Sequence, residues 1–277
     1  MPSQKADPYD NTLADGQIRS DTIVVTTSRS PDDVSVAHAR EIAREITCVF
    51  KQRSGVSLEA LRDSTGCEHV IVVTSDEVRL VSPERNFWFH PNMARARIEA
   101  MLRGEVDRLV ALAELKIGDS FLDVTCGLGA DAITAAHVVG ETGRVLAVER
   151  SDVLSAIVRH GMKIYKHRTE GVESAMRQVE IFTGDSAQFL QGQSDRSWDV
   201  IYFDPMFEKT VEQSQGIDVV RALAWLGSPG IVEIKNARRV ARRCVIMKDR
   251  IPGRKLHELG FEAVLKRGRI CYGRIDV

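Results

Sequence analysis

The chain has 277 residues, of which 43% are hydrophobic and 28% charged, and its formal net charge is −1. This length and composition suffice for one large core or two modest ones, which excludes a wholly disordered protein. No apolar run approaches the roughly 18 residues that span a bilayer, and residues 1–20 lack the layout of a signal peptide, so we expect a cytoplasmic protein with no membrane partner.

The numbers and positions of cysteines and basic residues indicate which kinds of binding site to expect. The five cysteines contain no C-x-x-C pair and are odd in number, which predicts neither a disulfide framework nor a zinc site. Between Lys235 and Arg274 there are thirteen Lys or Arg and three Asp or Glu, against twenty-five basic and thirty-six acidic residues elsewhere. Such segregation favours a protein that offers one basic face to a phosphate backbone.

The chain begins with a polar stretch, residues 1–20, which we expect to be a mobile tail. A small α/β unit is predicted over residues 21–85. Its expected role is docking or RNA positioning, since nothing in it resembles an active site. We predict strands at 22–27, 48–51, 69–74 and 78–81, and helices that start near Ser30-Pro31 and cover 57–62.

A connector with many aromatic residues follows at residues 86–118. It contains Phe87-Trp88-Phe89-His90-Pro91-Asn92 and continues with helical spacing up to Gly118, interrupted at Gly104. One interpretation is that the aromatic rings fill the junction between two units. The other is that the segment overhangs a pocket, where its aromatic rings and arginines would contact an unpaired base. The residues concerned are Phe89, His90, Arg95 and Arg97.

The remaining domain, predicted over 119–277, is built around the segment 121–132. An apolar run there ends in a turn with Gly127 and Gly129 and then opens a helix, which is typical of a cofactor cradle. Its glycine spacing also fits a dinucleotide-binding turn, with Glu149 placed for a ribose. Asp123 distinguishes a dinucleotide from S-adenosylmethionine as the ligand of this turn. A carboxylate there would repel the pyrophosphate of a dinucleotide, whereas it would pair with the cationic amino-acid end of S-adenosylmethionine.

Acidic residues recur where later strands are expected to end. Apolar strands are predicted at 144–149, 179–182 and 198–203, and each is followed by a helix or turn. This alternation predicts a parallel sheet with helices on both faces and its ligands at the carboxyl ends of the strands. Asp185 can equally serve as the N-cap of the next helix. The acids at these expected ends are Asp123, Glu149, Asp185 and Asp204.

Three motifs carry a resemblance to a known family: Asp123-x-Thr125-x-Gly127-Leu128-Gly129-x-Asp131-Ala132, Glu149-Arg150 and Asp204-Pro205-Met206-Phe207. Over residues 115–277 the chain resembles class I S-adenosylmethionine-dependent methyltransferases and, more narrowly, the 16S ribosomal RNA guanine-N2 methyltransferase J family. The resemblance implies a Rossmann-like sheet that ends in an antiparallel hairpin. It implies cofactor contacts at Asp131, Glu149, Arg150, Asp185, Ser186 and Asp204, with Ala130 where those relatives carry arginine.

The resemblance also implies the chemistry. The Asp204 carboxylate and the Pro205 carbonyl would hold the two hydrogens of an exocyclic amino group, and Phe207 would stack on the base. Methyl transfer of this kind requires alignment and exclusion of water rather than a metal ion. We expect Arg239, Arg243 and Lys248 to bind the phosphates of RNA, with ribosomal RNA as the leading candidate. The arginines at 238–243 also fit the solvent-exposed face of a helix.

Three other functions remain as alternatives. The chain could methylate another amine, such as adenine N6 or a protein side chain, because the shape of the acceptor pocket is not visible in sequence. It could be an RNA-binding protein that keeps the cofactor pocket without turnover, which an intact Asp204 and Phe207 argue against. A nicotinamide-dependent dehydrogenase is disfavoured by Asp123.

Overall fold

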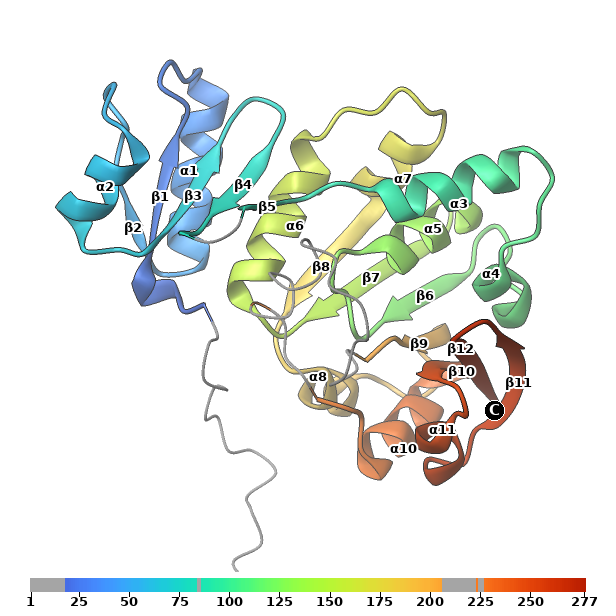
Figure 1. The fold of residues 1–277 in the computed structure, drawn as a ribbon. Helices are drawn as coiled ribbons and strands as arrows, with labels where there is room; N and C mark the ends of the chain where they lie inside the picture. Colours follow the sequence, from blue (N-terminus) through green and yellow to red (C-terminus); the bar gives the residue numbers. More distant parts are fainter. Residues whose placement is uncertain (1–17, 84–85, 206–222, 224–226) are drawn as a thin grey trace, which may run out of the picture.

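The computed structural model describes residues 18–83, 86–205, 223 and 227–277, and gives backbone only for residues 263–267. Two sheets lie side by side, joined by the segment between β5 and α3 (Figure 1). Most of the predicted mobile tail and the predicted stacking residue Phe207 lie outside the described residues. Within the described part, no helix has both the length and the apolar character to cross a bilayer.

The N-terminal unit is a five-stranded sheet with the order β2-β1-β3-β4-β5. Strand β1 pairs in parallel with β2 and β3, and β3, β4 and β5 follow as antiparallel neighbours. Asp32 caps α1 by accepting from the Ser35 backbone N–H at 2.7 Å. The elements are η1 (Ser20–Thr22), β1 (Ile23–Thr27), α1 (Asp33–Glu45), β2 (Val49–Phe50), α2 (Leu58–Thr65), β3 (His69–Val73), β4 (Val78–Val81) and β5 (Asn86–Trp88).

Two sequence predictions need correction at the ends of this unit. Ser20, predicted in the tail, begins the short helix η1. The aromatic segment starts as strand β5, whose Phe87 lies opposite Leu80 of β4, so this sheet extends past the boundary predicted at residue 85. The alternation of exposed Asn86, buried Phe87 and exposed Trp88 is typical of a strand with one buried face, and three residues were too few to reveal it.

The second unit is a seven-stranded sheet with the order β11-β12-β10-β9-β6-β7-β8. Strands β10, β9, β6, β7 and β8 are parallel, and β12 is antiparallel to both of its neighbours. The predicted parallel sheet with a C-terminal antiparallel hairpin is therefore confirmed. Its strands are β6 (Ser120–Asp123), β7 (Arg144–Glu149), β8 (Val179–Thr183), β9 (Trp198–Phe203), β10 (Ala241–Arg250), β11 (Glu262–Arg267) and β12 (Ile270–Asp276).

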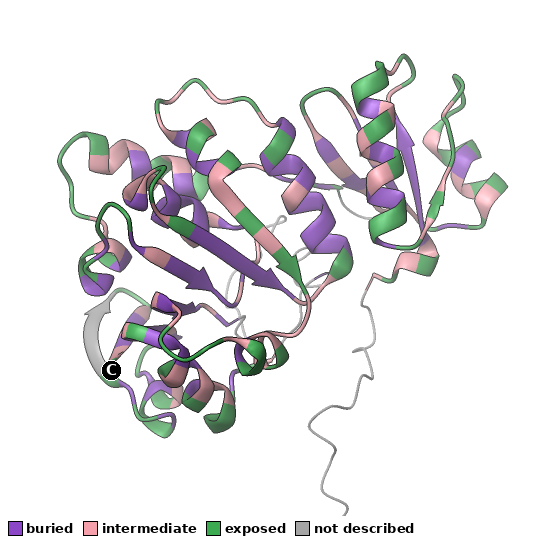
Figure 2. Cartoon of the chain, turned by 180° about the vertical axis from the view of Figure 1, so that it is seen from behind, coloured by how far each residue is buried: buried purple, intermediate pink, exposed green. Residues whose placement is uncertain are grey.

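Helices cover both faces of this sheet, and β9 shows why it is apolar throughout. Val200 and Tyr202 face the core under α5, α6 and α7, while Ile201 and Phe203 face the core under α10 and α11. Figure 2 shows the central strands in the colour of buried residues. The helices are α3 (Asn92–Leu102), α4 (Arg108–Ala113), α5 (Ala130–Val139), α6 (Asp152–Ile164), α7 (Val172–Gln178), α8 (Ser186–Gly192), α10 (Ile231–Val240) and α11 (Arg254–Glu258).

Candidate active site

Four acidic residues lie at one edge of the seven-stranded sheet. Asp123 and Glu149 are the last residues of β6 and β7, Asp204 follows β9, and Asp185 caps α8 just beyond β8. Because β9, β6, β7 and β8 are adjacent and parallel, their carboxyl ends meet at the same edge. The acids predicted to share a site therefore do share one edge.

Thr125 ties the end of β6 to the end of β9. Its hydroxyl accepts from the Asp204 backbone N–H at 2.6 Å and donates to Oδ1 of Asp123 at 3.2 Å. Its own backbone N–H donates to the same Asp123 oxygen at 3.0 Å. Thr125 thus fixes the backbone at one acid and the side chain at the other.

The glycine turn is fastened to the end of β7 through Glu149. Its two carboxylate oxygens accept from the backbone N–H groups of Gly127 and Ser151, each at 3.0 Å. Gly129 begins α5 with a φ of 72°, and a Cβ there would overlap the terminal methyl of Met162. A side chain at Gly129 would therefore be strained and would also displace its neighbour.

Burial makes this edge of the sheet unfavourable for negative charge. It raises the pKa of Asp123 to about 8, helped by the charge of Asp131 and opposed by the Thr125 N–H. Burial likewise raises the pKa of Glu149 to about 7, against the backbone N–H groups that it accepts. A cationic ligand would relieve the repulsion between Asp123 and Asp131, so the residues present fit the sulfonium and ammonium charges of S-adenosylmethionine.

Arg97 lies in this site, although the sequence analysis named it only as a possible base contact. Its guanidinium makes a two-pronged ion pair with Asp107, at 2.8 and 2.9 Å, and also binds Asp131. Arg97 comes from α3 and binds Asp131, the neighbour of Ala130. The resemblance implies that related enzymes carry an arginine at the position of Ala130. No spacing in the sequence could reveal it because its partner lies 34 positions away.

Lys248 lies beside Asp204, not on an open phosphate-binding surface. Its Nζ is 2.6 Å from Oδ2 of Asp204, because the strand register places Met247 of β10 opposite Phe203, the last residue of β9. Burial alone would lower the pKa of Lys248, but the carboxylates, Asp204 foremost, raise it above its usual value. Burial raises the pKa of Asp204, and the Lys248 ammonium opposes that rise. The predicted phosphate contact of Lys248 therefore competes with an internal ion pair.

A group of polar side chains, built around Asp185 and Ser186, lies just beyond the end of β8. The Asp185 carboxylate caps α8 by accepting from the Gln188 N–H at 3.0 Å, as one reading of the sequence expected, and lies 3.5 Å from an Arg150 nitrogen. Ser186 donates its hydroxyl to Glu233 of α10 at 2.6 Å. Burial raises the pKa of Glu233. The sequence analysis missed Glu233, which lies 47 positions from its partner.

The aromatic connector does not present Phe89 to a base. Phe89 is 1% exposed and its ring meets Tyr165 edge-on at 6.0 Å, so the prediction of a substrate contact is wrong for this side chain. It fills the junction because Gly161 of α6 leaves room for its ring. His90 lies edge-on to Trp88, and an Arg95 nitrogen lies 4.0 Å from Glu99. Their predicted roles in substrate binding stay predictions.

The two arginines predicted to bind phosphates lie at the opposite edge of the sheet, where the parallel strands begin. Arg243 pairs with Asp119, which precedes β6, at 2.6 Å. Arg239 pairs with Asp195 at 2.6 Å and donates to carbonyls at the end of α8. Both guanidinium groups thus serve the fold. Pro205 is buried beside Asp204, whereas Phe207 and Met206 fall outside the described residues.

Comparisons with known proteins agree with this geometry. A family profile described as "Putative SAM-dependent methyltransferase" matches residues 58–250. Uncharacterized protein YpiP from Bacillus subtilis is 36% identical over 245 residues, which cover 88% of this chain and 95% of that protein. A solved SAM-dependent methyltransferase from Neisseria gonorrhoeae superposes with a TM-score of 0.58 at 16% identity, covering 91% of this chain and 94% of its own, which shows the shared fold.

A more distant relative carries a more specific name. Ribosomal RNA small subunit methyltransferase J from Acinetobacter baumannii is 26% identical over 129 residues. That match covers 46% of this chain and 43% of the relative, less than half of either. The family profile, in contrast, spans most of the chain and includes every strand-end acid described above. The chain therefore belongs to the S-adenosylmethionine-dependent methyltransferases, with a class I, Rossmann-like catalytic domain and S-adenosylmethionine as its cofactor.

Proposed function

We propose that this enzyme methylates an exocyclic amino group of RNA, namely guanine N2 of small-subunit ribosomal RNA, in the cytoplasm. The observation that carries the proposal is the position of Asp204, a partly buried acceptor held at the site edge by Thr125 and Lys248. The Asp204-Pro205-Met206-Phe207 motif and the distant relatives named as ribosomal RNA methyltransferases support the choice of acceptor.

Each side chain has a definite task in this proposal. S-adenosylmethionine, when bound, supplies a methyl group already activated for displacement. Asp123 and Asp131 hold the cationic end of the cofactor, and Glu149 accepts from ribose hydroxyls. Asp204 accepts a hydrogen from the amine, which directs the nitrogen lone pair and stabilises the positive charge that develops on nitrogen. Lys248 is a positioning residue whose ammonium favours the ionised form of the Asp204 carboxylate and holds it in place.

Cofactor binding should release protons near neutral pH. With a pKa of about 8, Asp123 is mostly protonated at pH 7 in the free enzyme. A cation bound beside it favours the ionised form, so its pKa falls on binding, a proton leaves, and affinity increases as pH rises toward 8. Isothermal titration calorimetry at pH 7 in phosphate and in Tris should therefore give different binding enthalpies.

The matched control for this measurement is Asp123→Asn, which cannot release that proton. The variant should bind the cofactor more weakly and show a smaller difference between the two buffers, with Glu149 accounting for what remains. Equal enthalpies for the parent enzyme in both buffers would contradict the assignment of Asp123 to the cationic end.

The acceptor is tested on ribosomal RNA itself. Nucleosides from cells that lack the protein should be short of N2-methylguanosine at one position of the small-subunit RNA, and purified enzyme with labelled cofactor should restore it. Mass spectrometry of the digested RNA measures both. Restoration of a methyl group on adenine N6 would move the activity to the other amine class, and no transfer to any RNA would favour a protein acceptor.

The ion pair at Asp204 raises a second candidate, methylation of a hydroxyl oxygen. A lysine beside the acceptor could in principle take the hydroxyl proton. However, the raised pKa of Lys248 keeps it charged, so it is a poor base at neutral pH, and we favour the amine. The same nucleoside analysis separates the two because a ribose-methylated product would identify the oxygen acceptor.

A further inference from the structure

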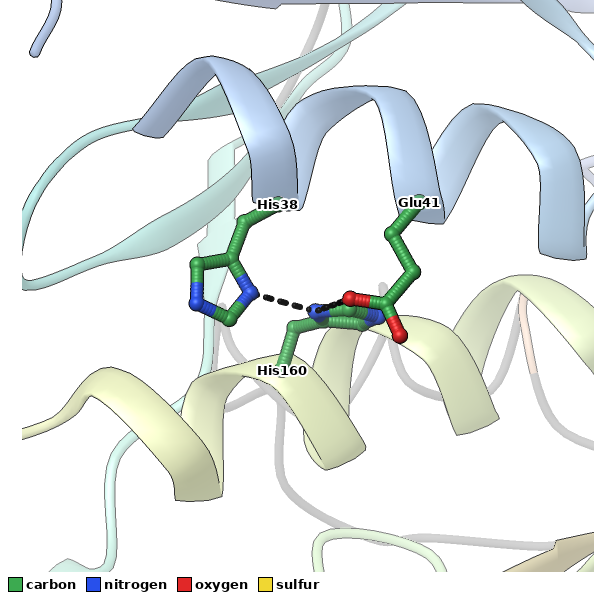
Figure 3. Close-up of side chains that lie close together, drawn as sticks. All are labelled: His38, Glu41 and His160. Atoms are coloured by element: carbon green, nitrogen blue, oxygen red, sulfur yellow. Dashed lines mark hydrogen bonds and ion pairs between the residues drawn. The ribbon is translucent and has the colours of Figure 1, made fainter. Parts of the chain in front are cut away.

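A cluster of two histidines and a carboxylate lies where the two units meet, outside the site described above. His38 and Glu41 stand one turn apart on the same face of α1, and His160 faces them from α6 (Figure 3). Helix α1 belongs to the N-terminal unit, whereas α6 covers the methyltransferase sheet. The cluster therefore joins segments that are 122 positions apart in the chain.

The spacing of the ligand atoms suits a metal ion. One nitrogen or oxygen from each residue lies within 4.8 Å of the other two. The Nδ1 atoms of His38 and His160 are 3.0 Å apart, and His160 Nδ1 is 4.0 Å from a Glu41 oxygen. Zinc bonds of 2.0–2.2 Å at tetrahedral angles place neighbouring ligands about 3.4 Å apart, between the two measured separations.

A neighbouring carboxylate sets the proton on His160. Its Nε2 lies 3.1 Å from Oε1 of Glu45, and a carboxylate only accepts, so Nε2 carries the hydrogen. The lone pair of His160 is then on Nδ1, which points toward His38 and Glu41. A carboxylate behind the distal nitrogen of a histidine is the arrangement that orients histidine ligands in metal proteins.

Each carboxylate at the cluster also has a basic partner. Arg159 binds the second oxygen of Glu45, and Lys163 lies 3.9 Å from the second oxygen of Glu41, so the two acids are balanced by two bases.

We propose that His38, Glu41 and His160 bind one divalent transition-metal ion of the zinc type, which fastens α1 to α6. His160 is fully buried, while the Glu41 side chain is 46% exposed, so solvent reaches the site and water can take a fourth position. The cysteine pattern gave no hint of this site because its ligands are histidine and glutamate from distant helices. Its role is structural, since the methyl-transfer residues lie at the strand ends.

The direct test is metal binding by the full-length protein. After treatment with a chelator and dialysis, the protein is titrated with Zn²⁺ in competition with a chromogenic zinc indicator, and with Co²⁺. We expect one equivalent of zinc per chain, and visible Co²⁺ absorption bands typical of a nitrogen and oxygen site. Zinc should also raise the melting temperature, because it binds the folded state alone.

Variants separate ligands from bystanders. His38→Ala and Glu41→Gln should each weaken zinc binding by more than about 100-fold, and Glu45→Gln by about 10- to 100-fold, the usual effect of losing an orienting partner. The control is His257→Ala, an exposed histidine on α11. His160 is left intact because its buried ring supports the fold.

Two results would overturn the proposal. One is zinc binding by the parent protein that is no tighter than binding by the His38→Ala, Glu41→Gln double variant. The other is stoichiometric binding that survives in that double variant, which would place the metal elsewhere. In either case His38 and His160 would simply form a hydrogen-bonded pair between the two helices.

Discussion

Replacing Asp204 by asparagine should lower the rate of methyl transfer at saturating cofactor by about 100- to 1000-fold, the usual effect of removing one preorganised charge-stabilising contact. The substitution keeps the size of the side chain and its backbone contact to Thr125. It removes the carboxylate charge that would stabilise the developing positive charge on nitrogen and that now pairs with Lys248. Single-turnover transfer of labelled methyl to RNA measures the chemical step directly.

Asp195→Asn is the matched control for this experiment. Asp195 is also ion-paired to a basic residue, but its side chain is 73% exposed and lies near the opposite edge of the sheet. Its loss should leave the single-turnover rate unchanged. If Asp204→Asn also transferred methyl groups at the parent rate, Asp204 would not orient the acceptor, and the motif would be only a strand-ending turn.

Phe89→Ala should lower the free energy of unfolding by about 3–5 kcal/mol, the range for deleting a buried phenylalanine. Phe89 is 1% exposed and packs against Tyr165 and Gly161 in the core between the connector and α6. Deletion of the ring leaves a cavity that these neighbours cannot fill without moving. Equilibrium urea denaturation followed by circular dichroism gives the change.

The adjacent Trp88 provides the comparison. It is 40% exposed and its ring lies 5.3 Å from the Arg79 guanidinium carbon, so Trp88→Ala should cost about 1 kcal/mol or less. A Phe89→Ala enzyme that is as stable as the parent but binds RNA poorly would reinstate Phe89 as the base-stacking residue predicted from the sequence.

Strands and their terminal acids could be predicted from the sequence because both depend on short-range patterns. A parallel strand buried on both faces is an apolar run, as in β9, and the residue that follows it is at the carboxyl end by definition. The apolar runs alone therefore suffice to place Asp123, Glu149 and Asp204 at strand ends. Helix α7 was not predicted, because its seven residues carry little periodic signal.

Partnerships between distant residues could not be predicted. Lys248 and Asp204 meet through strand register, and Arg97 reaches Asp131 from a helix before the sheet. The same reason applies to two residues of the basic segment 235–274. Arg239 and Arg243 are neutralised by Asp195 and Asp119, acids contributed by earlier segments. At these two positions, charge that is segregated along the chain is paired in space.

The strand order has a consequence for synthesis of the protein on the ribosome. Strand β10 lies between β9 and β12, yet β9 is translated well before it. Until β10 emerges, β9 is an open border of the growing sheet, because the backbone groups that pair with β10 in the finished protein have no partner strand. An unpaired apolar border is a template for aggregation, so translation that stops before residue 241 would yield insoluble fragments, not a shorter working enzyme.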